Sequence, residues 1–188
     1  MPVVNTSSFP FSDHHGSSII NMGALKPKKM FEDYIYLLKL RPDLNFRLYP
    51  MGSTKNIDGL RQLASQQGGK IEISDPVVFS KMPEIWKEHR WLVYTADRKL
   101  KSVGWPMSVV EAWASGTGVC IPRIRPDIEQ YVGDAAIVYD DIKEVADLIG
   151  EPPNAELLES GKRRAAEMDI KRWIHPLYEI WRQAGVAI

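Results

Sequence analysis

Apolar and polar positions alternate along the chain in blocks that predict strands and helices in turn. Short apolar runs, typical of buried strands, are each followed by a segment with apolar residues at helical spacing. The predicted strands are residues 17–22, 46–49, 70–74, 91–95, 119–121 and 135–139. The predicted helices are residues 28–40, 57–65, 81–88 and 107–115, a short turn at 128–132, and 154–168. This alternation predicts an α/β fold, a Rossmann-like open parallel sheet of about six strands with helices on both faces.

Both ends of the chain depart from this pattern. Residues 1–16 show no periodicity and are predicted to be a linker or edge segment, which leaves residues 17–188 as one Rossmann-like domain. Asp141 and Glu144 have the spacing of a capping box, followed by a helical stripe of apolar residues. A last helix begins after Asp169, and Pro176 inside it predicts a kink or two short helices. Its apolar residues share one face: Ile170, Trp173, Ile174, Leu177, Ile180 and Trp181.

The charge balance narrows the possible partners. The 188 residues include 24 Lys and Arg and 24 Asp and Glu. This balance argues against non-specific electrostatic binding to nucleic acid or to an anionic membrane. The sequence shows no apolar run long enough to span a membrane, and membrane contact is expected only through parts missing from this chain. The single cysteine, Cys120, lies in an apolar strand and is predicted to be buried. We expect a reducing, cytoplasmic compartment.

Residues 102–122 are the stretch with the clearest chemistry. A tight turn at Gly104 and Pro106 leads into the helix at 107–115, which Gly116 ends. The first N–H groups of a helix are unpaired and can bind an anion. Glu111 lies about one turn into this helix, where a carboxylate can accept hydrogen bonds from sugar hydroxyls. The alternative is an exposed polar residue on a half-buried helix with no role in binding.

The segment resembles the nucleotide-sugar loop of GT-B glycosyltransferases, in particular the retaining family-four (group 1) enzymes. The match is carried by Gly104-Trp105-Pro106-Met107-Ser108-Val109-Val110-Glu111-Ala112. In those enzymes an earlier glutamate precedes the glycine, and here that position is Val103. The resemblance implies donor-binding roles for Gly104, Trp105, Pro106, Met107, Ser108 and Glu111. Trp105 has an equally good alternative role as a core or interface aromatic residue.

The resemblance also points to the turn after the first strand. Family members usually carry Gly-Arg there with a Lys five residues after the Arg, and both cations hold the diphosphate. In this chain Gly23 is followed by Ala24 in place of the Arg, and Lys29 stands at the Lys position. Two further lysines, Lys26 and Lys28, are candidates to compensate, although a solvated helix start is the alternative for all three lysines. Main-chain groups near Val78 are a weaker candidate for holding the base.

These features together predict the C-terminal, donor-binding half of a GT-B glycosyltransferase, whose substrate is a nucleotide-diphosphate sugar. The resemblance implies an acceptor-binding N-terminal domain in the same or another chain, transfer with retention, and no metal or other cofactor. The catalytic residues stay unassigned, and the isolated domain is expected to be inactive. Because Val103 and Ala24 replace polar groups, the alternative is a non-catalytic, degenerate GT-B-like domain with a binding or structural role. An unrelated Rossmann-like enzyme is a third possibility.

Two other clusters suggest metal binding only superficially. His14 and His15 are adjacent, so in regular structure their side chains point in different directions, and no Cys or Glu partner has ligand spacing nearby. Asp140 and Asp141 form a carboxylate pair, but helix capping explains Asp141 more simply. The segment after the first strand also lacks the Gly-x-Gly-x-x-Gly pattern of dinucleotide oxidoreductases.

Overall fold

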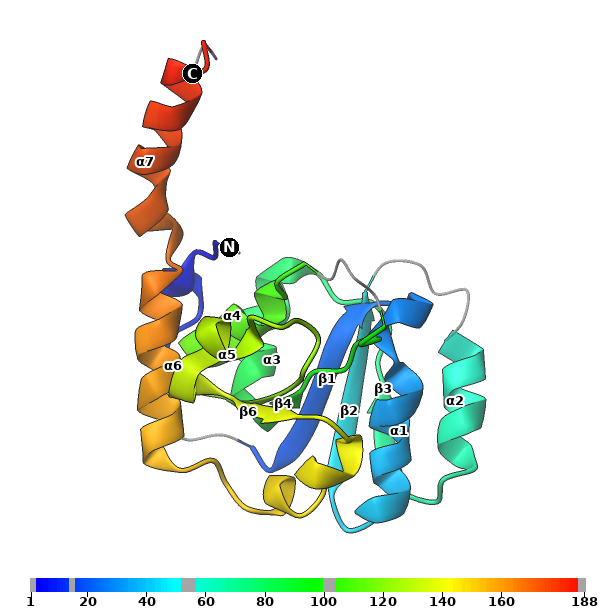
Figure 1. Cartoon of the computed structure of the whole chain (residues 1–188). Coiled ribbons are helices and arrows are strands. Elements are labelled where there is room, and N and C mark those ends of the chain that lie inside the picture. The colour runs from blue at the N-terminus through cyan, green and yellow to red at the C-terminus, as the bar shows by residue number, and fades with distance from the viewer. Residues whose placement is uncertain (1–2, 14–15, 52–56, 100–103, 186–188) are drawn as a thin grey trace.

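The computed structural model describes residues 3–13, 16–51, 57–99 and 104–185 (Figure 1). Its centre is a six-stranded sheet in the order β3-β2-β1-β4-β5-β6, in which every neighbouring pair is parallel. The strands are β1 Ser18–Ala24, β2 Asn45–Met51, β3 Lys70–Ile73, β4 His89–Val93, β5 Gly118–Pro122 and β6 Ile137–Tyr139. The predicted α/β sheet is therefore confirmed, and its strand order reverses between β1 and β4.

Helices cover both faces of this sheet (Figure 1). Consecutive residues of a strand point to opposite faces, and accordingly Ile19 and Ile20 of β1 belong to two different hydrophobic clusters. The Ile19 cluster includes residues of α1 Phe31–Leu40 and α2 Ile57–Ser65. The Ile20 cluster includes residues of α3 Met82–Lys87, α4 Met107–Ser115, α5 Ile128–Val132 and α6 Ala155–Glu167. The sheet is thus the middle of three layers.

Two predicted helices take a different form. The helix expected at 28–40 begins only at Phe31, because Pro27–Lys29 form a 3-10 turn (η2) and Met30 follows in the left-handed region, at φ 49°. The capping box at Asp141 and Glu144 is present, but it opens a 3-10 turn, η5 Ile142–Val145. A second 3-10 turn, η6 Leu148–Gly150, follows. The spacing of apolar residues alone does not distinguish such successive turns from one α-helix.

The last helix, α7 Ile170–Gln183, continues through Pro176 as a single element, so the alternative of two short helices is wrong. It projects away from the three layers (Figure 1), and none of its residues is buried. The N-terminal segment lies beside its base, where Val4 pairs with Asp169. None of the described helices is long and apolar enough to cross a membrane.

Candidate functional site

A crevice of about 210 Å³ lies at the carboxyl end of the sheet, at the β1–β4 switch point. Open α/β sheets bind their ligands at this position. Three segments far apart in the sequence form most of it: the end of β1 with the following turn, the region around η3 Phe79–Lys81, and the start of α4. Its lining residues are Met22, Gly23, Ala24, Lys29, Met51, Phe79, Met82, Pro106, Met107, Ser108 and Glu111.

Lys29 supplies the positive charge of the crevice. Its Nζ donates a hydrogen bond to the hydroxyl of Tyr94 at 2.7 Å and lies 4.1 Å from the centre of the same ring. Its carbonyl oxygen accepts a hydrogen bond from Thr95 Oγ1 at 2.6 Å. Burial, with a smaller contribution from the neighbouring Lys28, lowers the pKa of Lys29 to about 8. The amine therefore still carries a proton at neutral pH, but with less margin than an exposed lysine.

Gly23 makes room for that lysine. Its φ is 150°, a conformation that residues with a side chain rarely adopt. A Cβ atom at this position would lie 2.6 Å from Lys29 Cε and 2.9 Å from Lys29 Nζ. The glycine at the end of β1 thus lets the lysine stem lie directly against the backbone.

The start of α4 forms the facing wall. Pro106 is the N-cap residue, and Met107 and Ser108 are the first residues of the helix. All three line the crevice, so the N-terminal end of α4 faces it. The first N–H groups of a helix have no partners within the helix. Gly116 ends the helix in the left-handed region, at φ 86°, as its sequence position predicts.

Glu111 is the carboxylate of the crevice. Glu111 is 6% exposed, and its Oε2 accepts a hydrogen bond from Trp86 Nε1 at 3.3 Å. Burial raises the pKa of Glu111, and the hydrogen bond from Trp86 opposes this rise. Glu111 is therefore not a residue on a solvated helix face. It is a buried acid that reaches a cavity holding a lysine.

Sequence reasoning missed most of the apolar lining. The missed residues are Met22 and Met82, which are buried, Met51, and Phe79, which is 57% exposed at the rim. Charged and turn-forming residues mark a candidate binding site in a sequence, whereas apolar residues at strand ends give no comparable signal. Val78 is 61% exposed and precedes Phe79, so it lies beside the crevice rather than among its lining residues.

Two residues of the predicted loop lie outside this lining. The Trp105 ring stacks on Tyr131, with ring centres 3.7 Å apart, and the Arg125 guanidinium lies 4.6 Å from the Trp105 ring. This packing favours the core or interface role for Trp105. Gly104 is exposed to solvent, and Val103 lies outside the described residues.

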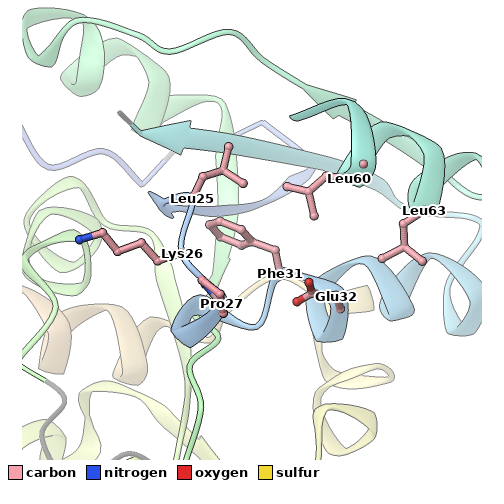
Figure 2. Close-up of a pocket in the computed structure, with 8 residues that line it drawn as sticks. Leu25, Lys26, Pro27, Phe31, Glu32, Leu60 and Leu63 are labelled. Atoms are coloured by element: carbon pink, nitrogen blue, oxygen red, sulfur yellow. The ribbon is translucent and has the colours of Figure 1, made fainter. Parts of the chain in front are cut away.

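The two other lysines take separate positions. Lys26 lines a pocket of about 340 Å³ between α1 and α2, whose apolar floor includes Leu25, Phe31 and Leu60. Figure 2 shows its amine extending away from those side chains. Lys28 is exposed, and its carbonyl oxygen accepts a hydrogen bond from the Asp97 N–H at 2.9 Å. Of the three candidate lysines, only Lys29 lines the crevice, within the part of the chain that the structure describes.

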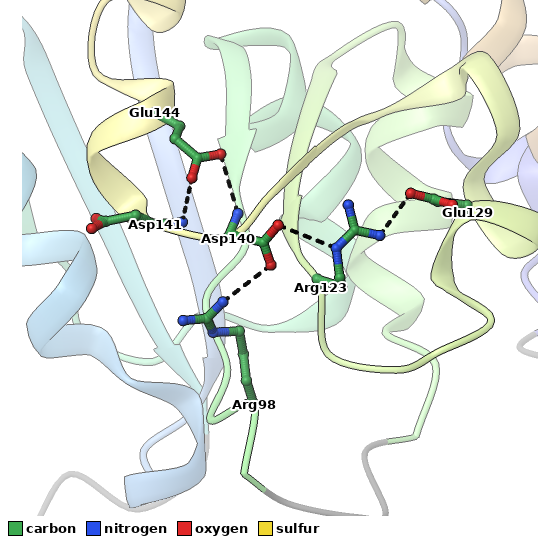
Figure 3. Close-up of polar contacts among 6 residues, drawn as sticks. All are labelled: Arg98, Arg123, Glu129, Asp140, Asp141 and Glu144. Atoms are coloured by element: carbon green, nitrogen blue, oxygen red, sulfur yellow. Dashed lines mark hydrogen bonds and ion pairs between the residues drawn. The ribbon is translucent and has the colours of Figure 1, made fainter.

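The aspartate pair has structural partners (Figure 3). Asp140 accepts hydrogen bonds from Arg98 and Arg123, each at 3.2 Å. Asp141 accepts from the Lys143 N–H at 3.0 Å, while the Asp141 N–H donates to Glu144 at 2.9 Å. Within the described ranges, no group of three or more His, Cys, Asp or Glu side chains could hold a metal ion. His14 and His15 lie outside those ranges.

The sequence matches no family model and no curated protein, whereas solved structures share its fold. TarM of S. aureus, solved with fondaparinux, α-GlcNAc-glycerol and UDP, aligns over 96% of this chain with a TM-score of 0.73 and 17% identity. HepE of Anabaena, in complex with UDP and glucose, aligns over 96% with a TM-score of 0.77 and 13% identity. The C-terminal domain of the group 1 glycosyl transferase LpcC of Francisella tularensis aligns over 87% with a TM-score of 0.66 and 15% identity.

The covered share of each neighbour shows which part is alike. This chain spans 38% of TarM and 55% of HepE, but 97% of the isolated LpcC domain. The chain has the fold of a GT-B C-terminal domain. The crevice therefore lies in the part of the fold that corresponds to the LpcC C-terminal domain. The predicted fold class is confirmed.

Proposed function

We propose that this GT-B domain is the donor-binding half of a retaining glycosyltransferase, and that its crevice holds the diphosphate and ribose of a nucleotide-diphosphate sugar. The observation that carries the proposal is the convergence of Lys29, the start of α4 and Glu111 on one crevice. They supply a cation, free helix N–H groups and a hydrogen-bond acceptor. This set complements a diphosphate joined to a ribose.

The proposed chemistry is electrostatic. The bond between the anomeric carbon of the sugar and the diphosphate breaks, and the oxygen of an acceptor hydroxyl bonds to the same face of that carbon. The proton of that hydroxyl passes to the departing diphosphate. Lys29 and the N–H groups at the start of α4 stabilise the negative charge that develops on the departing diphosphate. Glu111 accepts hydrogen bonds from the ribose hydroxyls and fixes the orientation of the nucleotide. The proposal includes no metal or other cofactor.

Glycosyl transfer also needs a domain that holds the acceptor, and we place it against α7. The segment that enters this domain and the helix that leaves it lie side by side, joined at Val4 and Asp169. The apolar side chains of α7 are exposed or half-buried. A second domain, in the same or another chain, would cover them. The proposal puts the protein in the cytoplasm, in line with a free, buried Cys120.

The non-catalytic alternative has one observation in its favour. Ala24 lines the crevice at the position where the resemblance implies an arginine. A methyl group cannot bind phosphate, so Lys29 is left as the cation among the described lining residues. Such a domain would bind a sugar nucleotide without transferring the sugar.

Calorimetric titration with UDP, GDP and ADP, each with and without magnesium, tests the proposal. UDP comes first because TarM and HepE were both solved with it. One diphosphate is expected to bind, and Glu111→Gln should weaken its binding about tenfold. Glu156→Gln on the exposed part of α6 is the matched control.

The outcomes separate the two proposals. Failure of all three diphosphates to bind at millimolar concentration would contradict a donor site in this chain. Binding without sugar transfer, once the acceptor-binding domain is supplied, would favour the non-catalytic alternative. Transfer by the 188-residue chain by itself would contradict the need for a second domain.

A further inference from the structure

We propose that Tyr94 is a positioning residue for Lys29. The Tyr94 hydroxyl holds the lysine ammonium at the side of the crevice where the diphosphate binds. The inference rests on the proposed function of the crevice and adds a residue that acts through Lys29. Tyr94 follows directly after β4, and its hydroxyl accepts the hydrogen bond from Lys29 Nζ at 2.7 Å. It is not among the lining residues, so its contact is with the lysine.

The same short segment also holds the backbone of Lys29. Thr95 Oγ1 donates to the Lys29 carbonyl at 2.6 Å, and Asn21 Nδ2 donates to Thr95 Oγ1 at 2.8 Å. Asn21 is fully buried in β1. Adjacent residues after β4 therefore fix the lysine at both ends, its carbonyl through Thr95 and its amine through Tyr94. Between them the stem lies against Gly23.

Tyr94 is itself held in place. It is 3% exposed, its N–H donates to the Cys120 carbonyl at 2.9 Å, and its own carbonyl accepts from the Tyr139 hydroxyl at 2.6 Å. Burial raises the pKa of Tyr94 to about 12, so the hydroxyl stays neutral near pH 7. A rigid, neutral oxygen thus faces the amine.

This contact has two consequences for binding. A lysine side chain loses much rotamer freedom when it is ordered, and ordering it beforehand reduces the entropy lost when the ligand binds. The hydroxyl also favours the protonated amine, against burial and the nearby Lys28. Among the lining residues that the structure describes, the other charged group is Glu111, on α4. Tyr94 therefore supports both the position and the charge of the lysine.

Tyr94→Phe removes the hydroxyl and keeps the ring. The pKa of Lys29, followed by NMR of protein with ¹³C-labelled lysine, should fall by about one unit because the charged amine loses its acceptor. Tyr34→Phe, on α1, is the matched control. It also removes a buried hydroxyl, one that donates to the Ile19 carbonyl at 2.8 Å. An unchanged Lys29 titration in Tyr94→Phe would overturn the inference. This readout needs no ligand.

A double-mutant cycle with UDP, and with GDP and ADP in parallel, tests the effect on binding. Tyr94→Phe should weaken the diphosphate about tenfold in the wild-type background, and much less in Lys29→Met. An equal loss in both backgrounds would mean that Tyr94 acts on folding rather than through Lys29, which contradicts the inference. If the wild-type chain binds none of the diphosphates, the proposed function fails, and the NMR titration still decides the role of Tyr94.

Discussion

Trp86 Nε1 lies 3.3 Å from Glu111 Oε2, so an indole buried in α3 donates a hydrogen bond to a carboxylate on α4. Trp86 is fully buried and Glu111 nearly so. Burial favours the neutral acid, whereas a donor to the carboxylate favours the ionised form. The indole therefore helps Glu111 to remain a hydrogen-bond acceptor in a largely apolar setting.

Replacing this donor should shift the pH dependence of nucleotide binding. In Trp86→Phe the pKa of Glu111, already raised by burial, rises further because the charged form loses a hydrogen bond. Binding that needs the carboxylate is lost as pH falls through this pKa, and the variant should lose it at a higher pH than the wild type. Calorimetric titration between about pH 5 and 8 measures the shift.

Trp91→Phe is the control for this experiment. Trp91 is equally buried and donates its indole N–H to the Glu151 carbonyl at 2.7 Å, in the other hydrophobic cluster. Its replacement costs a similar buried hydrogen bond but should leave the pH profile of binding unchanged. If both variants keep the wild-type profile, Trp86 does not act on the ionisation of Glu111.

Gly23→Ala should separate binding from stability. The added Cβ would lie 2.6 Å from Lys29 Cε, near the far end of a long side chain, so the lysine can move aside if it gives up its hydrogen bond to Tyr94. The remaining cost is the strain at φ 150°, on the order of 1 kcal/mol. We expect a modest fall in Tm together with a loss of nucleotide binding comparable to that in Lys29→Met.

Gly59→Ala is the matched glycine. It lies inside α2, and a Cβ there meets nothing within 4 Å. Alanine in a helix interior should raise stability by about 0.5–1 kcal/mol without any effect on binding. Thermal unfolding and UDP titration of both variants check these expectations, and wild-type affinity in Gly23→Ala would contradict the packing of Lys29 on this glycine.

Much of the fold could be predicted from the sequence because each strand and helix carries its own local pattern. The bounds of α4 and α2 agree with the prediction. Two of the departures, at Met30 and after Asp141, are places where 3-10 turns carry apolar residues at intervals that also suit an α-helix. Such turns are fixed by contacts from elsewhere, such as the bond from Thr95 to the Lys29 carbonyl.

The candidate site was predictable only in part. Lys29 follows from the family resemblance and Glu111 from its place one turn into a predicted helix, and the structure places both in the crevice. Their partners, Tyr94 and Trp86, lie 65 and 25 residues away along the chain, and neither residue carries a local signal of that contact. The orientation of the Trp105 ring, just before α4, likewise depends on Tyr131, which belongs to α5.

Lys29→Met should stabilise the domain at neutral pH. The pKa of Lys29 is lowered from 10.5 to about 8. Below pH 8 the folded and unfolded chains both carry the proton, so the folded state bears the full cost of the buried charge. Between about pH 8 and 10.5 the folded state releases the proton first, and this cost disappears. A pKa shift of this size corresponds to about 3 kcal/mol, and the loss of the hydrogen bond to the buried Tyr94 hydroxyl offsets part of it. The net gain should be on the order of 1 kcal/mol at pH 7, or about 2–4 °C in Tm, and should shrink above pH 8.

Thermal unfolding of the two proteins from pH 7 to 10 measures this gain. Lys28→Met is the control, since Lys28 is an exposed neighbour. A gain that is constant with pH would show that the charge of Lys29 is not its source. A loss of nucleotide binding together with a gain in stability is the combination expected of a residue retained for function.

The uncovered face of α7 predicts how the isolated chain behaves in solution. Ile180 and Trp181 are 58% and 42% exposed, and no residue of the helix is buried. Exposed apolar surface of this kind promotes association. The chain should therefore associate as its concentration rises, and the double variant Ile180→Ser, Trp181→Ser should reduce this association in sedimentation velocity.

Because the helix contributes no buried residue to the core, the free energy of unfolding of the double variant should change by less than about 0.5 kcal/mol. Arg182→Ser, on the same helix and paired with Glu179 at 2.7 Å, should leave association unchanged. A large fall in Tm in the double variant would instead mean that α7 packs against the sheet layers in solution.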